Sequence, residues 1–293
     1  MHEQLVDTGR VRLAVRRTGP EPTSAEAQRP VLLVHGLASN ARLWDGVAQR
    51  LGDAGHPVLA LDQRGHGRSD VPPDGYDTET CAADLAALVE VLGWVDALAP
   101  VVAGQSWGGN VVLTLAARHS GATAAIALVD GGWIRLGDRF ESFEQCWQVL
   151  APPSFEGVRY DDLAARVSGS HPDWPAEGIA GTLANLVESD DGTARARLSR
   201  EHHRSILLSL WRSDPRTLYP LVDVPTLLMP AGANVGATAV AEAAQTITEV
   251  RVSEYVGADH DLHAQHPARC ALDLHDLATR ADVRADLPRG TTA

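Results

Sequence analysis

The sequence predicts an α/β protein with a mostly parallel sheet, helices on both faces and a helical insertion that covers one end. Two observations carry this prediction. Short apolar runs typical of buried strands alternate with helical patterns in residues 1–132 and again in residues 216–280. Between these parts, residues 133–215 show helical patterns and a high aromatic content.

The expected elements of the core follow one another in the order that a parallel sheet requires. Strands are expected at residues 11–15, 31–34, 58–61, 101–103, 125–129, 226–229 and 250–255. Helices are expected at residues 41–51, 77–92, 111–118 and 237–247. Gly93 is a typical stop for the second helix. Parallel strands need such crossover helices, because each helix returns the chain to the start of the next strand.

The insertion, residues 133–215, contains no convincing strand pattern. Its helices are expected at residues 141–150, 160–167 and 194–211. All three Phe residues of the chain and four of its seven Trp residues lie in this insertion. We expect it to form a lid over an apolar cleft, with Trp133, Phe140, Trp147 and Trp211 touching the substrate. The alternative is that these aromatic side chains only pack the small core of the insertion.

Composition limits the class of partner. The net charge is -13 and the isoelectric point is about 5.3, so nucleic acid and anionic membranes are poor partners. The three cysteines are widely spaced and form no C-x-x-C motif, which argues against disulfides and zinc. The sequence lacks a signal-peptide pattern and a long apolar run, so we expect a cytoplasmic protein. Residues 281–293 are expected to be frayed.

The stretch GQSWGGN, from Gly104 to Asn110, is typical of a nucleophile elbow. An apolar run precedes it and an Ala- and Leu-rich run follows it, which predicts strand, sharp turn and helix. The flanking glycines allow the chain to reverse, so that the Ser106 hydroxyl is pushed above the sheet. The N–H of Trp107 then lies at a helix N-terminus, where an oxyanion is stabilised. We expect Ser106 to be a nucleophile; the alternative is a serine in a surface turn.

A serine hydroxyl needs a base, and His260 is the candidate. It follows the last expected strand, and working groups in α/β sheets lie beyond the carboxyl ends of strands. The alternative is a metal site, because His260, His263 and His266 are spaced three residues apart. No carboxylate-bearing motif such as H-E-x-x-H accompanies them, so we expect no metal.

Two further loops follow expected strands. A turn at His35-Gly36-Leu37 can aim the Leu37 N–H at the same point as the Trp107 N–H, which gives an oxyanion hole with two donors. The His35 side chain is expected to organise this loop rather than to do chemistry. Residues 62–70, DQRGHGRSD, alternate glycine with charged residues and predict a tight, internally paired turn.

Together these motifs resemble the α/β-hydrolase fold superfamily. His35-Gly36, DQRGHGRSD, GQSWGG and GADHDLHAQHP (residues 257–267) occur in the order of that superfamily. The resemblance covers almost the whole core and implies a serine hydrolase that needs no cofactor or metal. Ser106 would be the nucleophile and His260 the base. A serine at the elbow argues against the epoxide-hydrolase and haloalkane-dehalogenase branches, which use a carboxylate nucleophile.

The sequence departs from the superfamily pattern at the triad acid. The acid usually follows the strand at residues 226–229, where this chain has Asn234. Asp130 ends the strand before the insertion, and some branches, including certain lactonases, are similar in carrying their acid there. We therefore expect Asp130 to pair with the histidine. Its alternative role is to cap the first turn of the insertion, and Asp259 and Asp261 are weaker candidates.

The expected function is hydrolysis of a carboxylic ester or lactone through an acyl-enzyme, with an apolar or aromatic small molecule as substrate. One alternative is a C–C bond hydrolase that uses the same triad. Another is a catalytically silent, ligand-binding member, for which Asn234 is the only sign. The insertion carries no family motif, so the substrate and the oligomeric state are left open.

Overall fold

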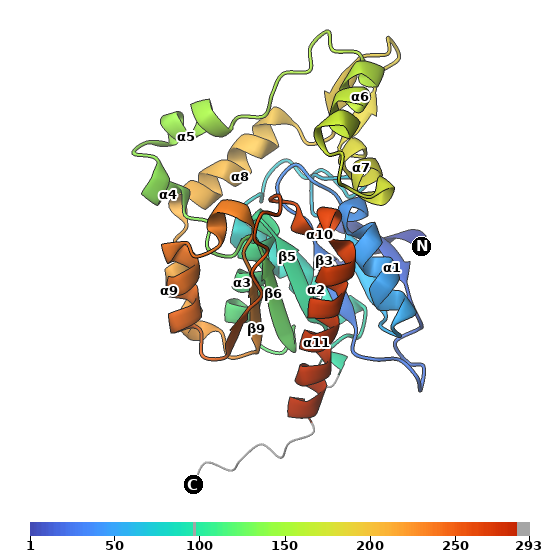
Figure 1. Cartoon of the computed structure of the whole chain (residues 1–293), viewed down its shortest axis with the longest axis vertical. Helices are drawn as coiled ribbons and strands as arrows, with labels where there is room; N and C mark the ends of the chain where they lie inside the picture. Colours follow the sequence, from blue (N-terminus) through green and yellow to red (C-terminus); the bar gives the residue numbers. More distant parts are fainter. Residues whose placement is uncertain (96–97, 286–293) are drawn as a thin grey trace.

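A computed structural model describes residues 1–95 and 98–285, and an eight-stranded sheet lies at its centre (Figure 1). The strand order is β1-β2-β4-β3-β5-β6-β9-β10. Strands β1 and β2 pair antiparallel, β2 is also antiparallel to β4, and all other pairs are parallel. The mostly parallel sheet predicted from the alternating pattern is therefore confirmed.

The strands lie close to the expected positions, with differences at the edges of the sheet. They are β1 (His2–Asp7), β2 (Arg12–Thr18), β3 (Val31–Val34), β4 (Val58–Leu61), β5 (Val101–Gln105), β6 (Ala125–Val129), β9 (Thr226–Met229) and β10 (Val250–Val252). Strand β1 was not expected, because an edge strand is half exposed and carries little apolar signal. Strand β10 is shorter than expected and ends at Val252.

Two hydrophobic cores lie on opposite faces of the sheet. Successive strand residues alternate between them, as Leu32 joins one core and Leu33 the other. Helices α2 (Thr78–Val91), α3 (Trp107–Arg118) and α9 (Thr238–Thr246) pack on the first face. Helices α1 (Asp45–Asp53) and α11 (Pro267–Ala285) cover the second face (Figure 1). Helix α11 continues to Ala285, so residues 281–285, which the sequence placed in a frayed tail, are helical; residues 286–293 lie outside the described part.

The insertion gathers at one end of the molecule (Figure 1). Its elements are α4 (Leu136–Arg139), α5 (Phe143–Leu150), α6 (Tyr160–Ser170), α7 (Ala176–Leu183), β7 (Leu186–Glu188), β8 (Ala194–Ala196) and α8 (Arg200–Arg212). Short 3-10 turns elsewhere are η1 (Ala41–Trp44), η3 (Pro215–Thr217), η4 (Tyr219–Leu221) and η5 (Gly232–Asn234).

The structure differs from the expectations for the insertion in three places. No strand was expected there, yet β7 and β8 pair antiparallel, and their three-residue strands are too short to show a period in the sequence. The helix expected at residues 194–211 begins only at Arg200, because Ala194–Ala196 pairs with Leu186–Glu188 in a short hairpin. Helix α7 was not expected, because its two glycines disfavour a helix. A Cβ on Gly181 would lie 2.9 Å from the Cα of Leu43, so the glycine allows α7 to pack closely on η1.

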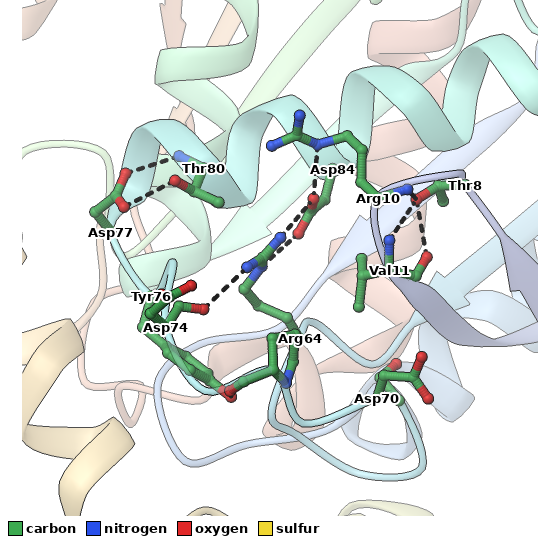
Figure 2. A network of polar contacts seen from close by, with 12 residues as sticks. Thr8, Arg10, Val11, Arg64, Asp70, Asp74, Tyr76, Asp77, Thr80 and Asp84 are labelled. Atoms are coloured by element: carbon green, nitrogen blue, oxygen red, sulfur yellow. Dashed lines mark hydrogen bonds and ion pairs between the residues drawn. The ribbon is translucent and has the colours of Figure 1, made fainter.

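The loop after β4, residues 62–70, is internally paired as its sequence predicts. The Asp62 carboxylate accepts hydrogen bonds from the N–H groups of Ala41, at 2.8 Å, and Arg68, at 2.9 Å. Arg64 turns the other way and donates two hydrogen bonds to Asp84, at 2.6 and 2.8 Å. Figure 2 shows that Arg10 reaches the same carboxylate, from the opposite side. The side chains of Arg64 and Asp84 are only 6% and 4% exposed, so this pair anchors the loop inside the protein.

Replacing Asp84 with alanine is expected to destabilise the fold by about 3 to 5 kcal/mol, because Arg64 keeps a buried charge without its partner. The free energy of unfolding can be measured by urea titration followed by circular dichroism. Asp70→Ala is the matched control: its pair with Arg12 is exposed and screened by water, so the urea midpoint should hardly change. Equal losses in the two variants would contradict this role of the Arg64–Asp84 pair.

Within residues 1–95 and 98–285, no helix combines the length and the apolar character that a membrane span requires.

Candidate active site

Ser106 occupies a sharp turn between β5 and α3. Its φ is 54° and its ψ is -125°, which is a strained conformation for a residue with a side chain. A Cβ on Gly104 would lie 2.2 Å from the Gly108 oxygen, and a Cβ on Gly108 would lie 2.4 Å from the His35 oxygen. The glycines on both sides of the serine are therefore required by the close contact of helix, strand and neighbouring loop.

Strain in the described part of the chain is concentrated around this turn. Only three described residues other than glycine have a positive φ, and they are Ala38, Ser106 and Asp130. They follow β3, β5 and β6, which are neighbours in the sheet. Such strain persists only where the surrounding structure imposes it, and it is common at functional sites.

The expected contact between Asp130 and His260 is present. His260 Nδ1 lies 2.5 Å from Asp130 Oδ2, and the Asp130 side chain is only 2% exposed. Asp130 Oδ1 accepts hydrogen bonds from the Ala231 N–H and the Asn234 Nδ2, both at 2.9 Å. Both oxygens of this buried carboxylate are thus used, so that its position is fixed. Asp259, a weaker candidate for the acid, instead accepts a hydrogen bond from the Trp174 indole at 2.8 Å.

Asn234 has a supporting function that the sequence analysis missed. This contact follows from the order of the strands in the sheet, because Val129 of β6 is paired with Met229 of β9. The segments that follow these two strands must therefore lie side by side, and residue 234 reaches the carboxylate of residue 130. The Asn234 amide holds the Asp130 carboxylate in place rather than taking its position beside His260.

The His260 imidazole has a perturbed pKa. Burial opposes its charged form, but the hydrogen bond that Nδ1–H donates to Asp130 and the negative charges of Asp261 and Asp130 outweigh this effect. The pKa is therefore raised above the ordinary value of 6.5. Within the described residues, no hydrogen bond joins the Ser106 hydroxyl to His260, and such bonds are often long before a substrate binds.

For the hydrolysis that the sequence predicts, this pKa sets the expected pH dependence. A general base must be neutral, and a raised pKa means that it loses its proton only at higher pH. We expect kcat/KM to fall on the acid side with a midpoint above 6.5, the ordinary histidine value. Asp261→Asn should move this midpoint to lower pH, because one of the charges that stabilise the imidazolium is lost. A midpoint that is the same in both proteins would contradict this assignment of the acid limb to His260.

Two backbone N–H groups lie beside Ser106. A Cβ on Gly36 would lie 3.0 Å from the Ser106 Cβ, so the turn at residues 36 and 37 packs directly against the serine. Trp107 is the first residue of α3, where N–H groups have no partner inside the helix. Within residues 1–95 and 98–285, neither the Leu37 N–H nor the Trp107 N–H donates a hydrogen bond. Both donors are available for a negatively charged oxygen.

A cavity of about 680 Å³ lies between this site and the insertion. Ser106, Asp130 and His260 line it, together with Leu37. The other residues that line it are Trp133, Ile134, Arg135, Leu136, Asp138, Arg139, Leu150, His203, Leu207, Leu210, Asn234 and Ala239. Its wall is therefore mainly apolar, with a few charged groups from α4 and the segment before it.

Of the four aromatic residues expected to touch the substrate, Trp133 lines the cavity and the other three do not. Phe140 is buried, and its carbonyl accepts a hydrogen bond from the Trp211 indole at 3.1 Å. The Trp147 ring lies beneath the Arg200 guanidinium at 4.9 Å. These three pack within the insertion, which was the alternative for them.

Three side chains of α8 form a wall of the cavity that was not expected from the sequence. His203, Leu207 and Leu210 are spaced as one face of a helix and point to the cavity. That spacing, i, i+4 and i+7, is present in the sequence and is the signal for this face of α8. The cavity is therefore lined more by leucine than by tryptophan or phenylalanine.

The three histidines spaced three residues apart do not converge. His260 contacts Asp130, whereas the buried His263 ring packs on Trp44 at 4.2 Å. The His266 ring lies 6.3 Å from that of Tyr255. In the described part of the chain, no group of three or more potential ligands is arranged to hold a metal ion.

Comparison with known proteins adds to this geometry. Residues 29–267 match the model of a family described as alpha/beta hydrolase fold. A similar curated protein is the 2-(acetamidomethylene)succinate hydrolase of Mesorhizobium japonicum, 28% identical over 265 residues, with 89% of this chain and 90% of that protein covered. The non-heme haloperoxidase of Rhodococcus erythropolis is 29% identical over 249 residues, with 80% of this chain and 86% of that protein covered.

Solved structures are similar over nearly the whole chain. The crystal structure of E-2-(acetamidomethylene)succinate hydrolase has a TM-score of 0.78 and 25% identity, covering 95% of this chain and 99% of that one. The enol-lactonase of Burkholderia xenovorans LB400 has a TM-score of 0.68 and 21% identity, covering 94% and 100%. The second likeness is one of fold alone.

Proposed function

The chain belongs to the α/β-hydrolase fold family and is a hydrolase, and we propose that it cleaves a carboxylic ester or lactone through an acyl-enzyme on Ser106. The observation that carries this proposal is the buried Asp130 carboxylate on Nδ1 of His260, in the same cavity as Ser106. The proposal needs neither a cofactor nor a metal, because serine, histidine and aspartate supply the nucleophile, the base and the charge.

In the proposed mechanism, His260 takes the Ser106 proton as the hydroxyl oxygen attacks the carbonyl carbon. The oxyanion of the tetrahedral intermediate accepts hydrogen bonds from the N–H groups of Leu37 and Trp107. The carbon–oxygen bond to the alcohol then breaks, and His260 gives its proton to that oxygen. His260 then takes a proton from water as the water oxygen attacks the acyl carbon, and it gives this proton to the Ser106 oxygen as the bond to the acyl group breaks and the acid is released. Asp130 stabilises the imidazolium in both halves.

Two alternative functions would use the same site differently. A C–C bond hydrolase could use the same three residues on a different substrate. A catalytically silent, ligand-binding protein was suggested only by Asn234, which stands where the triad acid is usual. The contact of Asp130 with His260 argues against this alternative, because a carboxylate is present beside the histidine. The mainly apolar wall supports a lid role for residues 133–215 and a substrate with an apolar body.

One observation favours a second class of substrate, one that also carries a carboxylate. Arg139 lines the cavity and forms no ion pair with any described residue, whereas Arg135 is paired with Asp138 and Glu242. The relative from Mesorhizobium japonicum is named for a substituted succinate, which is a dicarboxylate. Arg139 is therefore the residue that would pair with such a group.

A panel of p-nitrophenyl esters tests both proposals. We expect hexanoate and phenylacetate esters to have higher kcat/KM than the acetate, because Leu207 and Leu210 bury the added carbon atoms. Each member is compared with Ser106→Ala to remove background hydrolysis. Best activity on the acetate would contradict an apolar chamber. A preference for the monoadipate over the hexanoate that is lost in Arg139→Gln would favour the second class. Turnover of no ester would refute the proposed function.

A further inference from the structure

We infer that His66, in the loop after β4, is a positioning residue that holds the oxyanion hole in shape. The inference rests on the proposed function, since it concerns the donor N–H of Leu37. His66 lines no part of the catalytic cavity and would touch no substrate. It would act on the reaction only through the backbone that it binds.

The first support is the pair of hydrogen bonds made by the imidazole. His66 Nε2 lies 3.2 Å from the Ala38 nitrogen, whose N–H donates to it. His66 Nδ1 lies 2.9 Å from the Arg64 carbonyl oxygen, which can only accept. Nδ1 must therefore carry the proton, which leaves the lone pair on Nε2 for Ala38. One tautomer of one neutral ring satisfies both contacts.

The second support is the conformation of the residue that His66 binds. Ala38 directly follows Leu37, and its φ of 56° is unfavourable for a residue with a side chain. Without a bond to its N–H, this segment would relax toward ordinary backbone angles, and the peptide planes beside it would turn. The donor direction of Leu37 would then change with them. An oxyanion donor is effective only when it is held in place before the reaction.

The third support is that His66 touches both sides of the oxyanion hole. Its ring packs on that of Trp107, with centroids 5.7 Å apart and planes at 30°. It also lies 4.9 Å from the His35 ring. His35 in turn accepts the Gln63 N–H at 3.0 Å and donates to the Gly36 oxygen at 2.7 Å. The two imidazoles thus tie the loop after β3 to the loop after β4.

The loop that carries His66 is itself anchored. Arg64, whose carbonyl binds His66, is held by Asp84 (Figure 2). Burial, together with the neighbouring His35, lowers the pKa of His66 to about 3, so the ring remains a neutral acceptor throughout the working range. The chain of contacts runs from a buried ion pair through His66 to the oxyanion turn.

Two substitutions distinguish the effect of the hydrogen-bond acceptor of His66 from the effect of its ring volume. His66→Phe keeps a flat ring against Trp107 but removes the acceptor for Ala38. His66→Gln can place its Oε1 near the position of Nε2 and restore an acceptor. We expect His66→Phe to lower kcat by about 10-fold to 100-fold, less than removal of a whole donor, with little change in KM. His66→Gln should recover most of this loss.

A transition-state analogue and a matched control make the test specific. A trifluoromethyl ketone forms a hemiketal oxyanion with the serine, so its affinity for His66→Phe should fall by the same factor as kcat. The control is His56→Phe, a buried histidine at the amino end of β4 that binds the Arg29 oxygen and His275, away from the site. It should retain both kcat and analogue affinity per active site, as counted with a fluorophosphonate.

Several outcomes would overturn the inference. One is an unchanged kcat and analogue affinity in His66→Phe; another is a loss that appears equally in His56→Phe. If His66→Phe does not fold, nitrogen-15 NMR of the wild-type histidines still decides: the His66 ring should stay in the Nδ1–H tautomer from pH 5 to 9, roughly the range in which ordinary histidines titrate. Titration of that ring would refute the inference. Absence of ester turnover in the wild type would instead refute the proposed function.

Discussion

Ser106→Ala is expected to lower kcat for ester hydrolysis by about 10⁶-fold, because alanine has no oxygen to form the acyl-enzyme. The fold should remain intact, since the smaller side chain fits the same strained turn and keeps the glycine contacts around it. Hydrolysis of the best p-nitrophenyl ester measures the rate, and the urea midpoint measures the stability. The residual rate should match that of the solution reaction assisted only by the oxyanion hole.

Ser209→Ala provides the control for Ser106→Ala. Ser209 is half-buried, and its hydroxyl accepts a hydrogen bond from the Thr78 N–H away from the catalytic cavity. Its loss should leave kcat close to that of the wild type. A decrease of less than tenfold in Ser106→Ala, with normal stability, would show that another residue is the nucleophile.

Asp130→Asn is expected to lower kcat by about 10⁴-fold, which is the loss seen when a triad acid becomes an amide. The reason is twofold. An amide removes the negative charge that stabilises the imidazolium, and its NH₂ group can place a donor against Nδ1, which favours the wrong tautomer of His260. The same ester assay, in single-turnover form, measures the decrease.

Asn234→Ala distinguishes the proposed role of Asp130 as the acid from the role of Asn234 as a hydrogen-bond donor to it. The Asp130 carboxylate would keep the bond from the Ala231 N–H and lose one neutral donor, so kcat should fall by no more than about tenfold. The assignment is wrong if Asp130→Asn is nearly as active as the wild type, or if Asn234→Ala is the more damaging change. Either result would mean that the contact at 2.5 Å between Asp130 and His260 does not serve the reaction.

The central strands could be predicted because parallel strands are buried on both faces and appear as apolar runs. Strand β3, VLLV, is fully buried and lies where the pattern placed it. The edge strand β1, HEQLVD, faces water along much of its length and carries no such signal. The hairpin of β7 and β8 has three residues in each strand, too few for a period to be recognised.

Part of the candidate site could also be predicted from the sequence, and part could not. Ser106, Asp130 and His260 could be selected because each follows a strand, and parallel strands bring their carboxyl ends to one edge. The residues that form the walls of the cavity could not be selected from the sequence, because they depend on how α4 and α8 fold back over that edge. Phe140 and Trp211 are examples. Their aromatic side chains suited a substrate cleft, yet the Trp211 indole donates a hydrogen bond to the Phe140 carbonyl within the insertion. The support from Asn234 required the order of the strands.

The most direct test of the proposed function is to locate the acyl group. The enzyme is mixed with p-nitrophenyl hexanoate, quenched in acid within the first turnover, digested and analysed by mass spectrometry. One hexanoyl group per active site should be found on Ser106, formed in a burst of p-nitrophenol, and none should be found in Ser106→Ala. A hexanoyl group on another residue, or equal labelling in both proteins, would contradict the account.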